Sequence, residues 1–547
     1  MEMNRASVVF RYTEALSAPS SGLVMRAASD DCYKCTPLPL RPVGCAPTDV
    51  SCIYLMPNAN YTFDVDAKFP MTLSLRDGNR TVWQSHYHFT EFSNYSMLGQ
   101  QVSSGEVHAS IALEHAGTPS LLLPILLGLL GLWVASGFVL FFWKKHLAAL
   151  RDDDADDDTR PLLDQPPPPT SSRVVCLDVF RGITIFTMIF VNYGGGDYWF
   201  FNHSTWNGLT VADLCFPWFA WIMGATMAIG LPKKLRDPRG FARTATLRSL
   251  KLFGLGLFLN NGFDLAHWRI PGVLQSFGVA YWIVAMALLF AATTTADTRR
   301  QRLLQWAILL GVVALHAVVV YGLPVAGCPR GYLGPGGIGD FGQFGNCTGG
   351  AHKAVDLALF GNAHIFQNPT TKDVYLTGAF DPEGALNWLM VAVTAFIGFQ
   401  VATVFLGDAS LAASQRSIRL ALLALALGIA ALVACQGRLN DGWIPVNKNL
   451  WSLSFVLATS SLASWLLLAL FLMVDTHDMW RGAPFLQAGM NPIVLYLGHE
   501  LLQDHFPFGF KHGSTSHALS LLSALLGALC WLAIALLLHR KKLFISV

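Results

Sequence analysis

One stretch between two long apolar segments carries the side chains best suited to chemistry. It runs from Asn192 to Asp213 and brings an amide, the imidazole of His203 and a carboxylate to one membrane boundary. A histidine can take a proton, a carboxylate can orient that histidine, and an amide N–H can stabilise an oxyanion. Polar groups at such a boundary are functional candidates, because exposing them to lipid is costly. On residue type alone, His203 fits an interfacial aromatic belt equally well, and Asp213 fits a carboxylate favoured in the first turn of a helix.

The composition places these residues in a membrane protein. Of 547 residues, 53% are hydrophobic and 13% are charged, and the mean hydropathy is +0.43, whereas soluble domains carry about 25% charged residues. The formal net charge of +2 and the lack of a basic arm give no sign of a nucleic-acid partner. We expect no metal, since no second Cys/His pair follows Cys32 and Cys35 at zinc-ligand spacing.

The fold class that follows is a polytopic α-helical membrane protein with about 11 transmembrane helices and a small N-terminal luminal β domain. The apolar spans lie near 120–143, 177–193, 209–231, 249–261, 271–292, 303–323, 387–406, 418–435, 450–474, 485–503 and 516–538. Alternating apolar and polar residues in 1–118, with a turn at Asp77 and Gly78, predict an antiparallel β domain.

Three further regions follow the β domain. Residues 119–145 form the first transmembrane helix, and residues 146–175 form an acidic, proline-rich linker that we expect to be disordered. Residues 176–547 form a ten-helix membrane domain with a long loop at 324–386. Within the linker, Asp158–Leu163 resembles the acidic dileucine signal that sorts membrane proteins to lysosomes.

Basic residues orient the spans. Every second loop is rich in lysine and arginine, so these loops and the C-terminus should be cytosolic. The β domain, the His203 loop and the 324–386 loop should then lie on the luminal side. No apolar core of a signal peptide follows Met1–Arg5, so either the start of the protein is missing or the first span directs translocation.

Cysteines and glycosylation sequons support the same orientation. The extracytoplasmic regions hold six cysteines that we expect to form disulfides, with the pairing left open: Cys32, Cys35, Cys45, Cys52, Cys328 and Cys347. Sequons begin at Asn60, Asn79, Asn94 and Asn346 in the same regions.

Two more groups of polar residues are candidates for binding. A basic stretch from residue 233 to 251 would contact anionic headgroups or hold a polyanionic cofactor, through Lys233, Lys234, Arg236, Arg239, Arg243 and Arg248. Arg269, Lys448 and Glu500 lie at the same membrane level as His203. The G-x-G-x-x-G pattern from Gly334 to Gly339 is a turn-rich loop, because a dinucleotide site needs a strand before it and a helix after it.

Several strings together resemble the lysosomal heparan-α-glucosaminide N-acetyltransferase family. They include Asp178–Gly182, Val191–Gly196, Trp206–Asp213, Arg269–Gln275, Gly331–Phe341, Phe380–Gly384 and Ile444–Ser454. The resemblance covers most of the chain from about residue 173 onward. It implies an eleven-span enzyme of the lysosomal membrane that moves acetyl from cytosolic acetyl-CoA to the terminal glucosamine of heparan sulfate. The active-site histidine of the family corresponds to His203, and its neighbouring asparagine to Asn192.

The chemistry leaves alternatives open. His203, oriented by Asp213, acts as a base in a ternary complex, or it carries the acetyl group covalently. Arg269, Lys448 and Glu500 are candidates for binding the sugar, and the basic stretch for binding acetyl-CoA. An acyltransferase for another glycan and a secondary transporter are the rival functions, although we find no internal repeat of the transporter kind. Membrane lipid is an expected partner, and a homodimer is left open.

Overall fold

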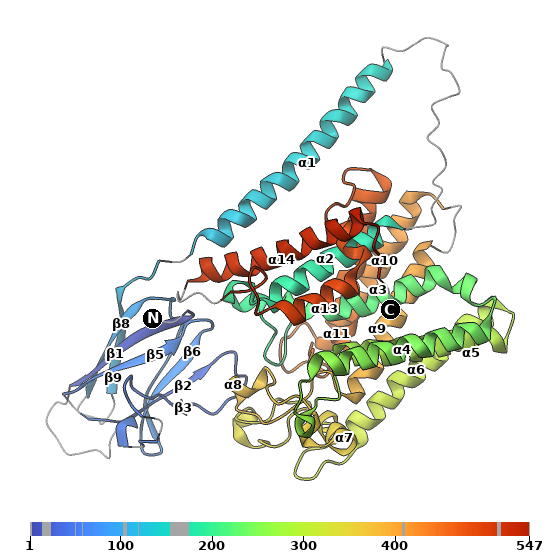
Figure 1. Ribbon diagram of the computed structural model, residues 1–547. Helices are drawn as coiled ribbons and strands as arrows, with labels where there is room; N and C mark the ends of the chain where they lie inside the picture. The colour runs from blue at the N-terminus through green and yellow to red at the C-terminus, as the bar shows by residue number, and fades with distance from the viewer. Residues whose placement is uncertain are drawn as a thin grey trace.

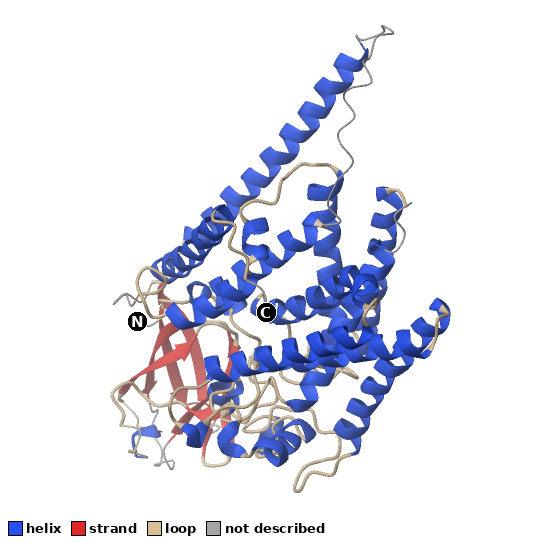
Figure 2. Cartoon of the chain, turned by 45° about the vertical axis from the view of Figure 1, so that its right-hand side comes forward, coloured by secondary structure: helices blue, strands red, loops and turns tan. Residues whose placement is uncertain are grey.

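The computed structural model describes residues 3–13, 23–46, 48–49, 51–56, 58–101, 107–118, 120–153, 174–406, 411–510 and 516–545. A small β domain and a helical bundle make up the described chain (Figure 1). Figure 2 shows the strands gathered at one end of the bundle. The predicted linker 146–175 begins inside a helix, and its middle, 154–173, with the predicted sorting signal, lies outside the described residues.

The β domain is a sandwich of two sheets. One sheet has the order β5-β1-β8-β9, from β5 (Asn60–Asp66), β1 (Arg5–Thr13), β8 (Asn94–Gln101) and β9 (Val107–His115). The other has the order β3-β2-β6-β7, from β3 (Leu38–Pro39), β2 (Leu23–Ser29), β6 (Met71–Asp77) and β7 (Arg80–Tyr87), with β4 (Tyr54–Leu55) pairing with β2. Inward-facing residues of both sheets, such as Phe10, Met25, Phe63 and Leu75, form one core.

The prediction of a purely antiparallel domain is wrong at one pair of strands. β1 pairs with β8 in parallel, since Ser7 lies opposite Asn94 and Thr13 opposite Gln100. Parallel neighbours need a long crossover, which here contains every strand of the second sheet as well as β5. The turn between β6 and β7 is confirmed, with Gly78 at φ +55°.

The described residues contain nine helices long and apolar enough to cross a membrane. Their helices are α1 (Leu122–Asp153), α2 (Val175–Asn192), α3 (Ala212–Lys234), α5 (Val273–Thr294), α6 (Thr298–Gly322), α9 (Ala385–Leu406), α10 (Ala413–Cys435), α11 (Leu453–Leu470), which continues as a π-helical turn to Thr476, and α14 (His517–Arg540). A polytopic membrane protein with a small β domain is therefore confirmed.

Two of the predicted spans differ from this pattern. The span expected at 249–261 belongs to α4 (Pro238–Asn260), which starts earlier because Asp237 caps it and Pro238 opens it. The charged first half of α4 lowers the mean hydropathy of this helix. Most of the basic stretch 233–251 lies in α4, so it is largely a helix rather than a loop. The span expected at 485–503 is divided into α12 (Phe485–Met490) and α13 (Pro492–Leu502), because Pro492 interrupts it.

Close helix contacts hold the centre of the bundle together. At Gly224 of α3, an added Cβ would collide with the backbone of Ala395 in α9, and at Gly398 of α9 it would collide with the backbone of Trp221. Small residues let the two backbones approach, which is the usual basis of helix packing in membranes.

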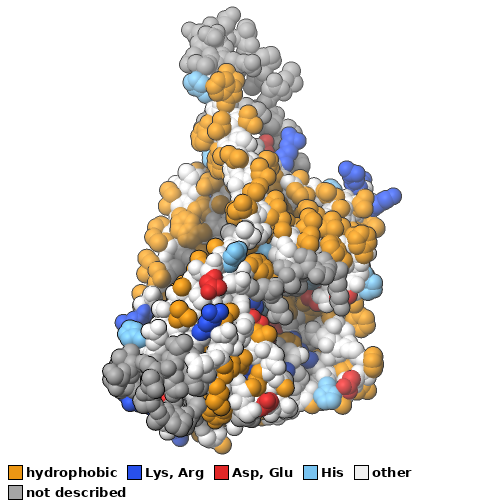
Figure 3. All heavy atoms as spheres, turned by 90° about the vertical axis from the view of Figure 1, so that its left-hand side faces the viewer, with side chains coloured by type: hydrophobic (Ala, Val, Ile, Leu, Met, Phe, Trp, Pro, Cys, Tyr) orange, Lys and Arg blue, Asp and Glu red, His pale blue; other side chains and the backbone are white. Residues whose placement is uncertain are grey.

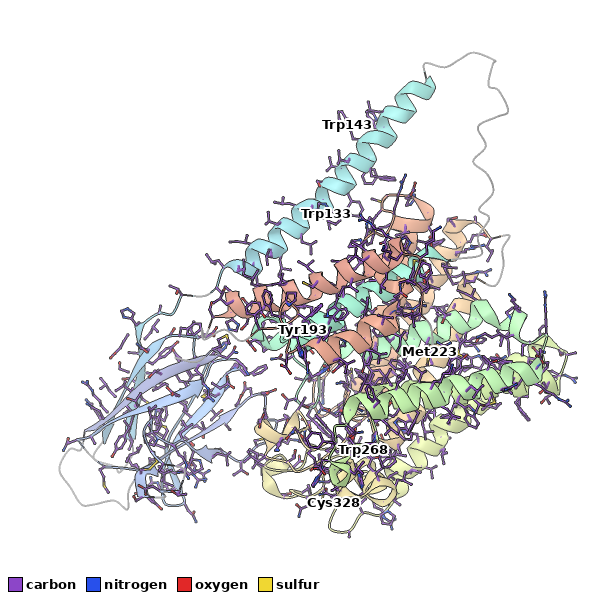
Figure 4. All side chains as sticks on the ribbon, viewed as in Figure 1. Trp133, Trp143, Tyr193, Met223, Trp268 and Cys328 are labelled. Atoms are coloured by element: carbon purple, nitrogen blue, oxygen red, sulfur yellow. A yellow bond between two sulfur atoms is a disulfide. The ribbon has the colours of Figure 1, made fainter. Side chains whose placement is uncertain are left out.

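Helix α1 stands apart from the bundle. It leaves the β domain near the start of α14, packs Leu123 of its first turn against the bundle and then diverges from α14 (Figure 1). Further along, the ring of Phe141 lies 5.9 Å from that of His477. Trp133 and Trp143 project from α1 into open space (Figure 4) and are 65% and 60% exposed. Figure 3 shows hydrophobic side chains spread over α1 and the bundle beside it, as expected for surfaces that face lipid.

The β domain rests on the loops at one end of the bundle, which we call the β-domain end. Glu91 accepts hydrogen bonds from His517 at the start of α14, and Lys34 pairs with Asp441. All six predicted cysteines are in disulfides, Cys32–Cys35, Cys45–Cys52 and Cys328–Cys347. Cys32 and Cys35 belong to the same hydrophobic cluster as Trp206 of the His203 loop, so the β domain forms part of the surroundings of that loop.

Candidate active site

A cavity of about 400 Å³ runs through the bundle between α2, α3, α4, α5 and α13. At the β-domain end its lining residues are polar: Asn192, His203, Glu383, Lys448 and Glu500. Its middle is apolar, with Met188, Phe216, Phe219, Met223 and Phe277. Its other end is bounded by Arg181, Met490 and Ile545, with Arg248 between the ends. In Figure 4, Tyr193 and Met223 mark the β-domain end and the middle of the bundle.

His203 and Asp213 form the central pair of the polar end. His203 Nδ1 lies 2.7 Å from Asp213 Oδ1, and the Asp213 side chain is fully buried. The second carboxylate oxygen accepts hydrogen bonds from the backbone N–H of Ser204 and of Thr210, both at 3.1 Å, and from the Thr210 hydroxyl. Ser204 and Thr210 of the loop before α3 thus fix the carboxylate, and the carboxylate fixes the imidazole, leaving Nε2 for the cavity.

Lys448 approaches the same imidazole from the loop before α11. Its Nζ lies 3.3 Å from His203 Nδ1 and 3.4 Å from Nε2. Because it is almost equally distant from both nitrogens, the ammonium sits beside the ring rather than in line with one lone pair. Asn447, one residue earlier, pairs with Asn207 through both backbone and side chain, which ties the two loops together.

Asn192, the last residue of α2, faces α13. Its Nδ2 lies 3.0 Å from His499 Nε2 and 3.4 Å from Glu500 Oε1. His499 is fully buried and also contacts the Leu495 carbonyl through Nδ1, at 3.2 Å. His499 therefore holds the Asn192 amide at the cavity wall, and the longer contact to Glu500 leaves its second N–H weakly engaged.

Arg269 does not line the cavity but holds a residue that does. It donates to both oxygens of Asp381, at 2.9 and 2.7 Å, and to Glu383 Oε2 at 2.5 Å, and its guanidinium lies 4.4 Å from the Phe366 ring. Sequence reasoning missed Glu383, although it stands in the Asp-Pro-Glu-Gly string of residues 381–384. Nothing local marks it as a site residue, because its partners are far away in the chain.

Of the six predicted basic residues, Arg248 alone lines the cavity. It is half-buried on α4, its guanidinium lies 4.6 Å from the Tyr281 ring, and its Nε has no hydrogen-bond partner among the described residues. Lys233, Arg236, Arg239 and Arg243 are exposed, and Lys234 is half-buried beside Phe241. Arg181 of α2 makes an ion pair with Asp178 at 3.0 Å and also lines the cavity.

Comparison with known proteins identifies the family. No protein-family model matches the chain. A mouse protein named heparan-alpha-glucosaminide N-acetyltransferase is 36% identical over 570 residues, covering 94% of this chain and 85% of the relative. A human protein of the same name is 37% identical over 519 residues, covering 85% and 77%. The chain belongs to the heparan-alpha-glucosaminide N-acetyltransferase family. The resemblance predicted from its sequence strings is confirmed.

Membership of the heparan-alpha-glucosaminide N-acetyltransferase family makes this protein an acyltransferase enzyme rather than a transporter. Its cavity brings together four residues predicted for the site, Asn192, His203, Lys448 and Glu500, with Asp213 directly behind His203. Their individual roles stay predictions, as do the roles of Arg269 and Arg248.

Proposed function

We propose that this enzyme transfers acetyl from cytosolic acetyl-CoA to the amine of a terminal α-glucosamine of heparan sulfate in the lysosome lumen. The observation that carries the proposal is one cavity with an imidazole–carboxylate pair at one end, Arg181 at the other and Arg248 between them. Acetyl-CoA is too highly charged to cross lipid, so an enzyme acting across a membrane must hold its phosphates on one side and pass its thioester to the other.

The orientation follows from chemistry at the two ends. The β-domain end carries the three disulfides and the sequons, which suit an oxidising, extracytoplasmic compartment. The opposite end carries the basic first half of α4 and Arg181. The phosphates of acetyl-CoA would meet Arg248 and Arg181, and the apolar middle of the cavity would hold the uncharged arm that ends in the thioester.

The reaction consists of deprotonation of the acceptor ammonium, attack of the amine on the thioester and departure of the thiolate. His203 Nε2 takes a proton from the ammonium, and the free amine attacks the thioester carbonyl carbon to form a C–N bond. The carbonyl electrons move to oxygen, where the Asn192 amide donates to the oxyanion. When they return, the C–S bond breaks, sulfur leaves with its electron pair and takes one proton, and the second proton of the amine is released to water. Asp213 stabilises the imidazolium during these transfers.

We favour direct transfer in a ternary complex over an acetyl-histidine intermediate. Donor arm and acceptor sugar share one cavity in this proposal, so the reacting atoms meet without a covalent relay. Incubation with radiolabelled acetyl-CoA and no acceptor should then leave the purified protein unlabelled after denaturation. Stoichiometric labelling that disappears in His203→Ala would establish the covalent route instead.

The heparan sulfate acceptor comes to this proposal from the names of the relatives, and the lysosomal location from the family resemblance and the predicted sorting signal at 158–163. An acyltransferase for another glycan is the competing proposal. The choice of acceptor distinguishes the two proposals, since an enzyme for heparan sulfate should prefer α-linked glucosamine at a non-reducing end over other amino sugars.

The decisive experiment uses purified protein in sealed proteoliposomes. Acetyl-CoA supplied on the side of α4 should support acetylation of glucosamine on the β-domain side, and His203→Ala should abolish it in protein that unfolds at the same temperature as wild type. Transfer only when both substrates are on the same side would contradict the proposed transmembrane arrangement. Full activity of the His203→Ala variant would contradict the site.

A further inference from the structure

Glu383 is a buried carboxylate in the polar end of the cavity that the mechanism above does not use. Its side chain is 8% exposed, and it reaches the cavity from the segment just before α9. Its Oε2 is held by Arg269, whereas Oε1 makes no hydrogen bond within the described part of the chain. A buried carboxylate that lines a cavity and has an unused oxygen is costly beside an apolar ligand. We therefore expect a polar or cationic ligand next to Glu383.

The surroundings of Glu383 keep it ionised. Burial by itself would raise the pKa of Glu383, but the guanidinium of Arg269 and the ammonium of Lys448 outweigh it and hold that pKa below its usual value. Arg269 is in turn anchored by Asp381, so its charge cannot move away. Glu383 therefore remains a carboxylate in an acidic compartment, where an exposed glutamate would begin to take up protons.

The charges around the polar end are unbalanced in favour of anions. Four carboxylates gather there, against two fixed cations: Asp213, Asp381, Glu383 and Glu500, with Arg269 and Lys448. An additional cation is the natural complement of this set. An amine acceptor is such a cation, since amino groups with pKa values near about 8 are protonated in an acidic lumen.

Resting on the proposed function, we propose that Glu383 binds the protonated amine of the acceptor sugar and thereby selects amino sugars and sets the nitrogen beside His203. Oε1 accepts a charge-assisted hydrogen bond from the ammonium. His203 Nε2 then removes one of its other protons, and Glu383 releases the nitrogen once it has become a neutral amide.

The other carboxylates of the cluster are less suited to this role. Both Asp213 oxygens are occupied by His203, Ser204 and Thr210. Glu500 is 36% exposed on its side chain and contacts the Asn192 amide and His499. Asp381 does not line the cavity and is used by Arg269. Glu383 alone among the four combines burial, a fixed position and an unused oxygen on the cavity.

The test compares a charged and a neutral ligand of the same sugar shape. With acetyl-CoA as donor and detergent-purified full chain, the KM of glucosamine and the inhibition constant of N-acetylglucosamine are measured for wild type and Glu383→Gln. We expect the KM for glucosamine to rise about 10- to 100-fold, with the constant for N-acetylglucosamine and the KM for acetyl-CoA within about threefold of wild type. The loss should shrink above about pH 8, where the amine is neutral.

Two further variants separate binding from structure. Glu500→Gln removes the second cavity carboxylate and should change both sugar constants by a similar factor. Glu383→Asp keeps the charge and should recover part of the discrimination. Equal effects of Glu383→Gln on the amine and the amide, or none on either, would overturn the inference. Absence of acetyl transfer to any amine by wild type would instead overturn the proposed function, so the two failures are distinguishable.

Discussion

His203 Nδ1 lies 2.7 Å from Asp213 Oδ1, and every other contact of that carboxylate comes from the same loop and helix turn. The hydrogen bonds that form the pair thus lie within eleven residues, and distant loops add Lys448, whose Nζ lies 3.3 Å from Nδ1, and Glu383. Because the carboxylate accepts a hydrogen bond from Nδ1–H, Nε2 is the ring nitrogen that can act as a base. Asp213 is thus assigned two roles, positioning the imidazole and stabilising its positive charge, and one substitution of Asp213 tests both.

Asp213→Asn should lower kcat by about 10²- to 10⁴-fold. The amide is of the same size but carries no charge to stabilise the imidazolium, and it can present an N–H to Nδ1, which favours the wrong tautomer. The KM for acetyl-CoA should be little changed, because Asp213 lies behind His203. Steady-state kinetics measures this, with Asp264→Asn as control, since Asp264 pairs with exposed His267 away from the cavity. Comparable losses in both variants would contradict the assignment.

Arg248→Gln should raise the KM for acetyl-CoA about tenfold or more while leaving the KM for the sugar unchanged. Its guanidinium is the basic group of α4 that lines the cavity, and a charge-assisted contact to phosphate should be lost. Arg243→Gln is the matched control on the same helix, since Arg243 is exposed and does not line the cavity. If Arg243→Gln raises the KM as much as Arg248→Gln does, the donor binds at the surface rather than in the cavity.

The local parts of this site were predictable from sequence, whereas its long-range parts were not. His203, Asp213 and Asn192 lie close together in the chain next to apolar spans, so their residue types made them candidates, and the family resemblance singled out His203 and Asn192. Glu383 is separated from His203 by about 180 residues. Its role depends on Arg269 and on the cavity, which only the packing of α2, α3 and α5 creates.

The fold, too, was predictable where local sequence decides it and not where distant contacts do. Hydropathy located nine spans, since a long apolar helix needs no tertiary information. It underestimated α4, because arginines in its first half lowered the average, although Asp237 and Pro238 are readable start signals. The parallel pairing of β1 with β8 could not be read from alternation, which specifies faces of a strand but not its neighbour.

The stability of the protein should fall as the pH rises from about 6.5 to 8, because of Asp356 in α7 (Ala351–Phe360). Burial raises the pKa of Asp356 to about 8. Between the unfolded pKa near about 3.9 and this value, the folded chain holds one proton more than the unfolded chain. The slope is on the order of 1.4 kcal/mol per pH unit at most. Thermal unfolding of wild type should show it, and Asp356→Asn should remove it.

His352, also in α7, should mask this slope at lower pH. Burial and the neighbouring His316 lower the pKa of His352 to about 3, so below about 6.5 the unfolded chain binds the extra proton. The two effects therefore oppose each other from about pH 4 to 6.5. His352→Gln should make the slope of stability against pH more negative in this range than it is in wild type. An unchanged profile in both variants would rule out these two groups as its origin.

Thr205→Val should lower kcat about tenfold without changing the KM for acetyl-CoA, because Thr205 connects the His203 loop to the β domain. Its hydroxyl donates to Asp31, with 2.8 and 3.0 Å to the two carboxylate oxygens, and its carbonyl accepts from Asn449 at 3.2 Å. Burial raises the pKa of Asp31, so the carboxyl group depends on this hydroxyl as a partner. Valine keeps the shape of threonine and removes only the hydrogen bond, which lets His203 shift by the fraction of an ångström that catalysis does not tolerate.

Lys34→Gln provides the control for a general loosening of the β domain. The Lys34–Asp441 pair bridges the same interface at 2.9 Å, but both side chains are about half exposed, and such pairs contribute little. The Lys34→Gln variant should have a kcat within about twofold of wild type. Should Lys34→Gln reduce kcat as far as Thr205→Val does, the β domain would act through its overall docking, and the specific hydrogen bond from Thr205 to Asp31 would carry no positioning role.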